Sequence, residues 1–512
     1  MAYYLGLDNG GTVTKAAIFD STGRSLALAR VETEVQITGP GFAERDMEQM
    51  WHANCTVIRS ALEQAKLSPE EIACVTCCGH GKGLYLWGTD NCPVRPGILS
   101  TDHRASDYPL QWKRNGTAEA VFRRTYQHIL SSQPVALMAW LRDHEPESLE
   151  KTKWVFSCKD YIRFRLTGQA RGEKTDFSGN NLLNLQTGEY DSDLLSLFGL
   201  SKYSSLLPPL CESTELCGVV TAEASRDTGL RPGTPVAGGA FDIDACALAV
   251  GITSEEDLCM IAGTWSINEF ICRRPVLDGS VMMNSLFCIP GYYLVEECSP
   301  TGAGNLEWFI HTLLPELQQQ EKEQRGSIYN QLNQWVQEIP ETEFCPTFLP
   351  FLMGGNIREA ASGALIGIKQ SHTRAHIARS VYEGVIFSHK WHFDRLLAAR
   401  KCPPRAIRLA GGVTRSAVWT QMFADGIGLP VEVVDVQETG TLGCAILGAV
   451  AVGEYDTIEE ATAHMCKIMD PILPRTEYAK TYRTKYRLYL ETLDALAPLW
   501  ETIDQYQRQR KS

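Results

Sequence analysis

The chain lacks the features that would direct it to a membrane or to nucleic acid. No apolar run approaches the length of a membrane-spanning helix, and the first residues have neither the basic nor the apolar segment of a secretion signal. Basic residues are the minority: 48 Lys and Arg stand against 61 Asp and Glu, a formal net charge of −13. Because nucleic acids and anionic membranes attract basic surfaces, we expect neither as a partner, and we expect a cytoplasmic protein.

The cysteines lack a pairing pattern. Their number, 17, is odd, and they are scattered through 512 residues, which is typical of proteins that keep reduced thiols. Cys74, Cys77 and Cys78 stand near His80, an arrangement that invites a zinc site. No second Cys or His pair follows at partner spacing, so small buried thiols in a strand are the favoured interpretation.

What is present is the composition of a soluble globular protein, with 44% hydrophobic and 21% charged residues. The length indicates two large domains or more. Strands alternate with helices in both halves, which predicts the α/β class. Helices are expected over 47–65, 373–398, 442–452 and 478–508, and a loop is expected over 40–46.

The stretch 5–20 has the pattern around which the rest is organised. Two apolar runs flank a short polar turn that contains Asp8, Gly10, Gly11 and Thr12. Glycines let the backbone approach a ligand closely, and a carboxylate beside free N–H and hydroxyl donors suits hydrated magnesium and phosphate. The alternative is an ordinary β-hairpin without a ligand.

The second half repeats this pattern. Expected strands over 258–261 and 266–272 flank a turn that contains Gly263 and Thr264. Thr264 and Thr12 are 252 positions apart (264 − 12), close to half the chain, which favours duplicated domains. Facing each other across a cleft, the two turns would hold one polyphosphate; two unrelated turns are the alternative.

Two further places follow predicted strands. Gly411 and Gly412 stand between a strand and a helix, where glycines allow a close backbone approach and a helix N-terminus attracts anions. Tight strand–helix packing explains them almost as well. Asp242 ends a buried-looking strand and Asp244 follows, so either carboxylate can serve as the proton acceptor of a phosphoryl transfer or as a helix cap.

Polar side chains also end the strands of the first half. His80, Lys82, Asp102 and Arg104 are the donors and acceptors that a hydroxyl-rich ligand needs at fixed places. The segment 79–83 resembles a phosphate-binding glycine loop without its full fingerprint. Surface loops contain such residues too, so each one alone is weak support for a site.

In this order, the motifs resemble the FGGY family of carbohydrate kinases over residues from about 3 to 454. The matching stretches are Leu-Gly-Leu-Asp-Asn-Gly-Gly-Thr at 5–12, Pro-Gly-Phe-Ala-Glu-Arg-Asp at 40–46, Gly-Gly-Ala-Phe-Asp at 238–242, Ala-Gly-Thr-Trp at 262–265, Phe-Leu-Pro-Phe-Leu at 348–352, Leu-Ala-Gly-Gly-Val-Thr-Arg-Ser at 409–416 and Gln-Met-Phe-Ala-Asp at 421–425. The resemblance implies two actin-like (ribonuclease-H-like) ATPase domains around a central cleft, over 1–248 and 249–485, and a C-terminal helix over 486–512.

The resemblance also implies the chemistry: ATP and Mg²⁺ as cofactors, Asp242 rather than Asp244 as the catalytic base, and Asp8 as the metal ligand. The positions implied for the nucleotide and its phosphates are Asp8, Gly11, Thr12, Gly263, Thr264, Gly411, Gly412 and Arg415. The positions implied for the sugar are Glu44, His80, Lys82 and Asp102.

Three departures bear on the sugar. D-xylulose kinases have Gln-Met-His-Gly where this chain has the residues 80–83, and Gly-Asp-Asn where it has 241–243. The Trp of their Trp-x-Asp-x-Arg motif is Ser100 here. These changes, with Gly-Lys-Gly-Leu at 81–84, make the chain most similar to the L-xylulose kinase branch.

The sequence therefore favours an ATP-dependent kinase of a small ketose or polyol, a pentulose such as L-xylulose. D-xylulose, D-ribulose, glycerol and erythritol are the alternative substrates. A non-catalytic sugar or nucleotide sensor on the same fold ranks below. An actin- or chaperone-like ATPase ranks lower too, because no third domain is evident. A homodimer is left open as the oligomeric state.

Overall fold

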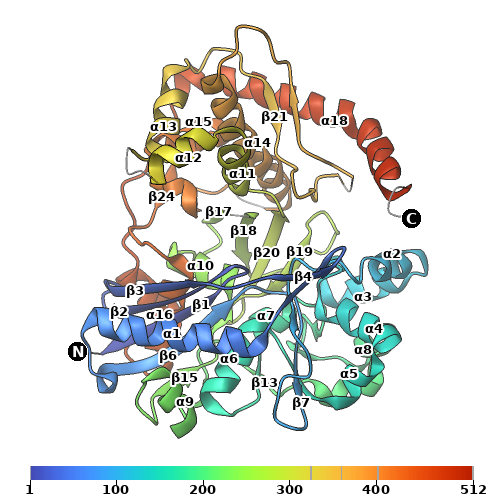
Figure 1. Ribbon diagram of the computed structural model, residues 1–512, viewed down its shortest axis with the longest axis vertical. Coiled ribbons are helices and arrows are strands. Elements are labelled where there is room, and N and C mark those ends of the chain that lie inside the picture. Colours follow the sequence, from blue (N-terminus) through green and yellow to red (C-terminus); the bar gives the residue numbers. More distant parts are fainter. Residues whose placement is uncertain (1, 264, 323–325, 359, 401–402, 510–512) are drawn as a thin grey trace. The chain divides into compact units, whose positions relative to one another are not determined.

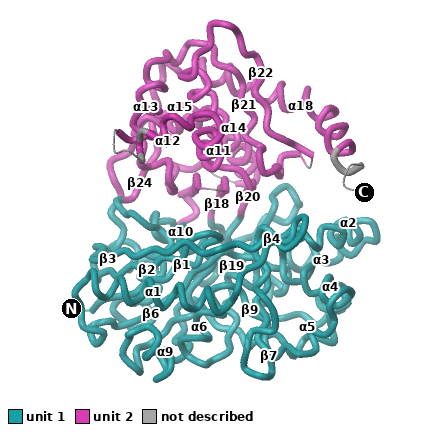
Figure 2. The backbone as a smooth tube through the Cα atoms, viewed as in Figure 1, with its two compact units in different colours: residues 1–253, 271–295, 435–467 teal, residues 254–270, 296–434, 468–512 magenta. Residues whose placement is uncertain are grey.

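A computed structural model describes residues 2–263, 265–322, 326–358, 360–400 and 403–509. The chain divides into two compact units (Figure 2). The first comprises residues 1–253, 271–295 and 435–467, and the second comprises 254–270, 296–434 and 468–512. The late segment 435–467 thus belongs to the first unit. The domain limits expected from the sequence place this segment in the second domain, 249–485.

The first unit is built on a mixed sheet with the strand order β14-β15-β6-β1-β2-β3. Figure 1 labels all of these strands except β14. The short strand β16 also pairs with β6, and β1 runs antiparallel to β2 but parallel to β6. The bounds are β1 Tyr3–Asn9, β2 Val13–Asp20, β3 Ser25–Glu32, β6 Ile72–Gly79, β14 Leu216–Val219, β15 Pro235–Ala237 and β16 Ala240–Phe241.

Alternation along the strands gives this sheet two buried faces. Leu5, Leu7 and Val75 belong to the core beneath the helices α1 (Met47–Ala65) and α6 (Cys158–Thr167), to which α9 (Ala222–Thr228) is added. The expected helix 47–65 is confirmed, and the Asp46 carboxylate caps it by accepting from the N–H of Gln49.

The opposite face of the sheet carries α16 (Thr439–Ala451) and α10 (Asp242–Ala249), followed by α17 (Ile458–Met465). Glycines allow this close packing. A Cβ on Gly6 would lie 2.1 Å from the carbonyl oxygen of Thr441, and one on Gly443 would lie 2.0 Å from that of Ala245. The buried helix that the sequence predicts at 442–452 is therefore confirmed, with its start three residues earlier.

A second core in the first unit lies among helices that follow β7. The segment 40–46, expected as a loop, instead contains the strand β5, which pairs with β4 and β8. The bounds are β4 Gln36–Gly39, β5 Phe42–Arg45, β7 Tyr85–Gly88, β8 Gly97–Ile98, β9 Thr152–Phe156, α2 Asp107–Arg114, α3 Thr117–Thr125, α4 Pro134–His144, α5 Pro146–Lys151, β10 Gly172–Glu173, α7 Lys174–Ser178, β11 Leu183–Asn184, β12 Glu189–Tyr190, α8 Ser192–Leu197, β13 Leu210–Cys211 and β19 Met283–Leu286.

The sheet of the second half contains the order β20-β18-β17-β23-β24. β17 is antiparallel to β18 and parallel to β23, as β1 is to β2 and β6, so the two halves share one strand arrangement. The bounds are β17 Leu258–Ala262, β18 Ser266–Cys272, β20 Tyr293–Ser299, α11 Gly304–Leu313, α12 Pro315–Lys322, α13 Ile328–Glu338, β21 Thr347–Leu349, β22 Ala364–Ile366, α14 Arg374–Ala399, β23 Ile407–Ala410, the 3₁₀ turn η3 Gly412–Arg415, α15 Ala417–Ile427, β24 Val431–Val433 and α18 Ala479–Gln509.

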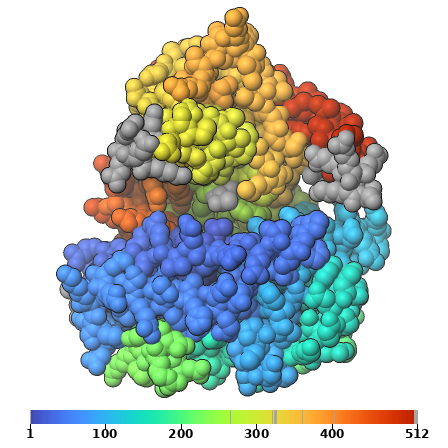
Figure 3. Space-filling view, viewed as in Figure 1, coloured from blue at the N-terminus to red at the C-terminus, as the bar shows by residue number. Residues whose placement is uncertain are grey.

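The expected helices 373–398 and 478–508 are confirmed as α14 and α18. The long helix α18, red in Figure 3, lies at the surface of the second unit. Within the described ranges, no helix combines the length and the apolar character that crossing a membrane requires.

Candidate active site

The β1–β2 turn places a carboxylate beside an ammonium group. Asp8 is the penultimate residue of β1, and Lys15 lies opposite it on β2. The Lys15 ammonium is 3.3 Å from the Asp8 carboxylate and 2.8 Å from that of Glu438, which precedes α16. Burial would lower the pKa of Lys15, but the charges of Asp8 and Glu438 raise it overall, so this group stays positively charged.

Arg45 hydrogen-bonds to the backbone of the β1–β2 turn, and the tip of the turn is exposed. The buried guanidinium of Arg45 donates to the carbonyl oxygens of Gly10, at 3.2 Å, and of Gly11. Gly11 and Thr12 are exposed. The backbone N–H groups and the Thr12 hydroxyl therefore lie where a phosphate can reach them, close to the charge pair of Asp8 and Lys15.

The N-terminus of α16 approaches the same carboxylate. A Cβ on Gly440 would lie 3.1 Å from the carboxyl carbon of Asp8 and 3.2 Å from the sulfur of Cys78. The thiol of Cys78 is 3.6 Å from Asp8 Oδ1. A side chain at this position would be tightly packed against Asp8 and Cys78, and the positive helix end favours negative charge there.

Asp242 begins α10 directly after β16. Part of Asp242 is exposed, whereas Ile243 and Asp244 are buried. Burial of the carboxyl raises the pKa of Asp242 well above its usual range. The negative charges of Asp8 and Asp176 raise it further, and the positive charge of Lys82 opposes them. A carboxylate with a raised pKa is a stronger proton acceptor than an ordinary aspartate.

Asp244 has a structural environment instead. It is fully buried, and its Oδ1 accepts a hydrogen bond from the N–H of Cys288 at 3.2 Å. Among the described residues, none hydrogen-bonds its Oδ2. Burial and the charge of Glu173 raise the pKa of Asp244 well above its usual range, which favours a neutral carboxyl.

The segment 79–83 lies against the residue that precedes the candidate base. A Cβ on Gly81 would lie 2.2 Å from the ring of Phe241, and the Lys82 ammonium lies 5.3 Å over that ring. His80 is buried, its Nε2 is 2.8 Å from the Tyr85 hydroxyl, and burial lowers its pKa to about 4. This segment thus presents a neutral imidazole and an ammonium near Asp242.

Glu44 and Asp102 belong to one buried ion network. Arg104 lies 2.6 Å from Glu44 and 2.9 Å from Asp102, while its guanidinium packs over the ring of Phe42. Asp102 is completely buried, and its second contact is the N–H of Ala43, which donates to it at 2.7 Å. Asp102 therefore orients Arg104 and the β5 backbone, and any effect on a sugar passes through them.

The second unit brings its own glycine turns together. Gly263 follows β17 and Gly411 follows β23, and a Cβ on Gly411 would lie 2.4 Å from the carbonyl oxygen of Ala262. Gly411 has a φ of +94°, which also favours glycine. Gly412 and Arg415 are exposed, and Thr264 lies outside the described residues.

Sequence reasoning missed Lys15 and Glu438. The available signal was a lysine near the start of a mostly apolar strand, four residues after Gly11. Glu438 carried no local signal. It is far from Lys15 in the sequence, and the two side chains meet only because α16 packs on β1.

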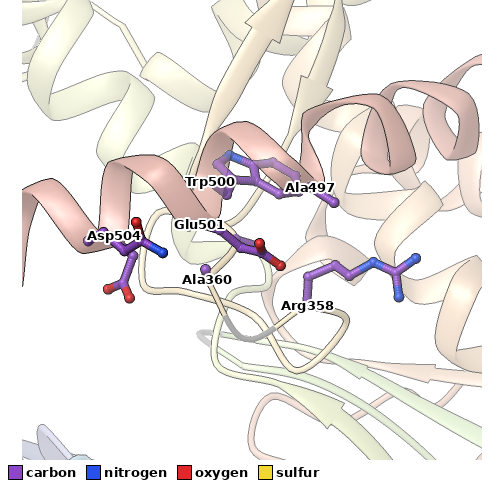
Figure 4. Close-up of a pocket in the computed structure, with 8 residues that line it drawn as sticks. Arg358, Ala360, Ala497, Trp500, Glu501 and Asp504 are labelled. Atoms are coloured by element: carbon purple, nitrogen blue, oxygen red, sulfur yellow. The ribbon is translucent and has the colours of Figure 1, made fainter.

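The pocket in Figure 4 contains none of the predicted site residues. It has a volume of about 390 Å³ and lies between α18, which contributes Trp500, Glu501 and Asp504, and the segment with Arg358 and Ala360. Arg358 forms an ion pair at 2.8 Å with the exposed carboxylate of Asp494. The charges that line this pocket are of both signs and indicate no particular ligand.

Sequence comparison decides the family. Residues 3–249 match the N-terminal domain of the FGGY family of carbohydrate kinases, and residues 258–452 match the C-terminal domain. The chain belongs to the FGGY family of carbohydrate kinases. The resemblance inferred from the motifs is confirmed, and this FGGY chain is a sugar kinase with the actin-like fold.

Individual relatives agree with this assignment. A probable L-xylulose kinase of Pasteurella multocida is 36% identical to this FGGY kinase over 502 residues, 97% of this chain and 99% of that protein. The L-xylulose/3-keto-L-gulonate kinase of Escherichia coli is 36% identical over 497 residues, 96% and 97% of the two chains. The crystal structure of xylulose kinase from Rhodospirillum rubrum has a TM-score of 0.85 at 26% identity, covering 98% of this chain and 100% of that chain.

Proposed function

We propose that this kinase transfers the γ-phosphoryl group of ATP to a hydroxyl of a small ketose, a pentulose such as L-xylulose, with Asp242 as the general base. Relatives named L-xylulose kinase, which are 36% identical over nearly the whole chain, support the substrate class. The observation that carries the mechanism is the position of Asp242, partly exposed at the start of α10 and next to the segment 79–83.

In this mechanism Asp242 accepts the proton of the sugar hydroxyl. The oxygen attacks the γ-phosphorus as the bond to the bridging oxygen of ADP breaks, and the proton stays on the carboxyl until product leaves. The raised pKa of Asp242 suits this step, because proton acceptance works best when the pKa of the base lies near the working pH.

The phosphates would lie at the open tip of the β1–β2 turn. Gly11 and Thr12 offer donors there, and the Lys15 ammonium supplies positive charge. The carboxylate of Asp8 is a hard oxygen ligand near this turn, so it would hold Mg²⁺, which would neutralise phosphate charge. We also propose nucleotide contacts in the second unit, because the FGGY family motifs place the nucleotide at the matching positions. These positions are Gly263, Thr264, Gly411, Gly412 and Arg415.

The sugar would lie against the segment 79–83 and the Glu44 network. His80 and Lys82 are near Asp242, as the packing of Gly81 on Phe241 indicates. Both ring nitrogens of the neutral His80 imidazole already have protein partners, the Gly81 carbonyl oxygen and the Tyr85 hydroxyl, so His80 would act by holding the segment 79–83 in place for the sugar. Glu44 and Asp102 would act largely through Arg104.

Lys82 favours a second candidate substrate, a sugar acid. An ammonium group in the sugar segment can pair with a carboxylate, which a neutral pentulose lacks. The Escherichia coli relative is named for 3-keto-L-gulonate as well as L-xylulose. A keto sugar acid therefore joins the pentuloses as a substrate to be tested.

The test is a coupled assay of ADP release with a panel of acceptors. It includes L-xylulose, D-xylulose, D-ribulose, 3-keto-L-gulonate, glycerol and erythritol. We expect the highest kcat/KM with L-xylulose or the sugar acid. A preference for glycerol or erythritol, or ADP release that no sugar accelerates, would contradict the proposal.

A further inference from the structure

A cluster of charged side chains is buried in the first unit, apart from the groups assigned to phosphate and sugar. Its members all have at most 1% of their surface exposed: Lys159, Asp160, Arg163, Glu173 and Asp176. The Lys159 ammonium lies 2.9 Å from Asp160, 3.2 Å from Glu173 and 3.8 Å from Asp176. Burying so many charges is costly, and apolar side chains of similar volume often stabilise a core better. The cluster therefore calls for a role beyond stability.

The cluster is connected to the short segment that leads into Asp242. Arg163 donates to the carbonyl oxygen of Gly238, and its guanidinium is also paired with Asp160 at 2.9 Å. The N–H of Phe241 donates to the Thr175 hydroxyl oxygen at 2.9 Å. Two backbone groups of the segment 238–242 are thus hydrogen-bonded to side chains of α6 and α7: the carbonyl of Gly238 and the N–H of Phe241. Phe241 directly precedes Asp242.

The Thr175 hydroxyl can bond in only one direction. It lies 2.7 Å from Glu173 Oε2, and a carboxylate only accepts hydrogen bonds, so the hydroxyl must donate to Glu173. Its lone pair is then free to accept from Phe241. The Lys159 ammonium lies 3.2 Å from the same oxygen, Glu173 Oε2, and the Ser213 hydroxyl donates to the other carboxylate oxygen at 2.8 Å.

We propose that Thr175 is a positioning residue, oriented by the Lys159–Glu173 pair, which fixes the Phe241 peptide and thereby the carboxylate of Asp242. The proposal rests on the proposed function of Asp242 as the base. β16 is only two residues long, so few other backbone bonds define the direction in which α10 begins. An error of about 1 Å in the position of a reacting group costs roughly 10²-fold in rate.

Thr175→Val tests this directly, because it keeps the shape of the side chain and removes both hydrogen bonds. We expect kcat to fall by at least roughly tenfold, with the KM values for sugar and ATP within about twofold of the parent, because alignment rather than binding is lost. Thr175→Ser keeps the hydroxyl, so it should retain most of kcat.

Thr228→Val is the matched control. Thr228 is also buried, donates to the carbonyl oxygen of Ala224 at 2.7 Å and accepts from the N–H of Leu230 at 3.2 Å. The same chemical change is therefore made on α9, away from Asp242. If Thr175→Val lowers kcat no more than Thr228→Val does, the proposal is wrong. If Thr175→Val fails to fold, Thr175→Ala serves instead, and a kcat equal to that of Thr175→Ser overturns the proposal.

A double variant separates this inference from the proposed function. In the Asp242→Asn background, Thr175→Val should change the residual kcat by less than about twofold, since the group it positions is gone. Full additivity would show that Thr175 acts elsewhere, even if Asp242 is the base. A fully active Asp242→Asn enzyme would instead remove the proposed function, and with it the premise of the inference.

Discussion

The ammonium of Lys15 lies 3.3 Å from the carboxylate of Asp8, on the neighbouring strand of the β1–β2 turn. The carboxylate of Glu438 is paired with the same ammonium at 2.8 Å. With phosphates at the tip of this turn, as proposed, a positive charge fixed beside it can stabilise the charge that spreads over a phosphoryl group in transfer. We therefore propose that Asp8 and Lys15 act as one pair.

Lys15→Met should lower kcat/KM for ATP by about 10²-fold, the usual effect of removing one preorganised charged donor. Lys15→Arg should recover part of that loss, because it keeps the charge but not the compact ammonium. Lys113→Met on the exposed surface of α2 is the control. A Lys15→Met enzyme with normal kcat/KM for ATP would exclude a role for Lys15 at the phosphates.

Asp102→Asn should destabilise the first unit, because it leaves the buried charge of Arg104 with a weaker partner. Breaking a buried pair costs about 3 kcal/mol or more, which corresponds to a fall in Tm of roughly 5 °C. Asp143→Asn removes a partly exposed pair with Arg142 and should cost under about 1 kcal/mol. Thermal denaturation compares the two, and equal shifts would contradict a structural role for Asp102.

Asp176→Asn should change how stability depends on pH. Burial raises the pKa of Asp176 to about 7 in the folded protein, against 3.8 in the absence of the fold, although Lys159 opposes the shift. Between these values the folded protein keeps a proton that the unfolded chain loses, so stability falls as pH rises and levels off above pH 7.

The Asn variant lacks that loss. Its Tm relative to the parent should therefore rise between pH 5 and pH 8. The titration of Asp176 changes the free energy of unfolding by at most roughly 4 kcal/mol in total, because each pKa unit corresponds to about 1.4 kcal/mol. A Tm difference between the two proteins that does not change with pH would show that Asp176 does not titrate in this range.

Lys82→Met should shift the acid limb of kcat/KM for the sugar to higher pH. The positive charge of Lys82 lowers the pKa of Asp242, so removing that charge raises it. Activity requires the carboxylate form and is lost as pH falls through this pKa. A limb that stays in place or moves to lower pH in Lys82→Met would contradict the assignment of the limb to Asp242.

Most of the fold could be predicted from local patterns. The apolar periodicity of 47–65 and the glycine turn after Leu7 correspond closely to α1 and the β1–β2 hairpin. The segment 40–46, which begins with Pro40 and Gly41, is a loop in the sequence prediction. In the structure these two residues form the turn of a local hairpin between β4 and β5, and β5 also pairs with β8, more than fifty residues later, a pairing that no local pattern reveals.

The sequence indicates the proposed site only where its residues stand in motifs. Asp8 lies near the end of β1, and Gly411 and Asp242 directly follow strands, whereas Glu438 reaches Lys15 only because α16 packs on the sheet. The opposite environments of Asp242 and Asp244 were also hidden in the sequence. The two carboxyls are two residues apart, and only the course of α10 makes one partly exposed and the other buried.

The most direct test of the account is the kcat of Asp242→Asn, measured by ADP release with the preferred sugar from the acceptor panel. Asparagine keeps the size of the side chain but cannot accept the proton. We predict a fall in kcat of roughly 10²-fold or more, with ATP binding nearly unchanged in a direct titration. A variant that turns over at the parental rate would contradict the role of Asp242 as the base.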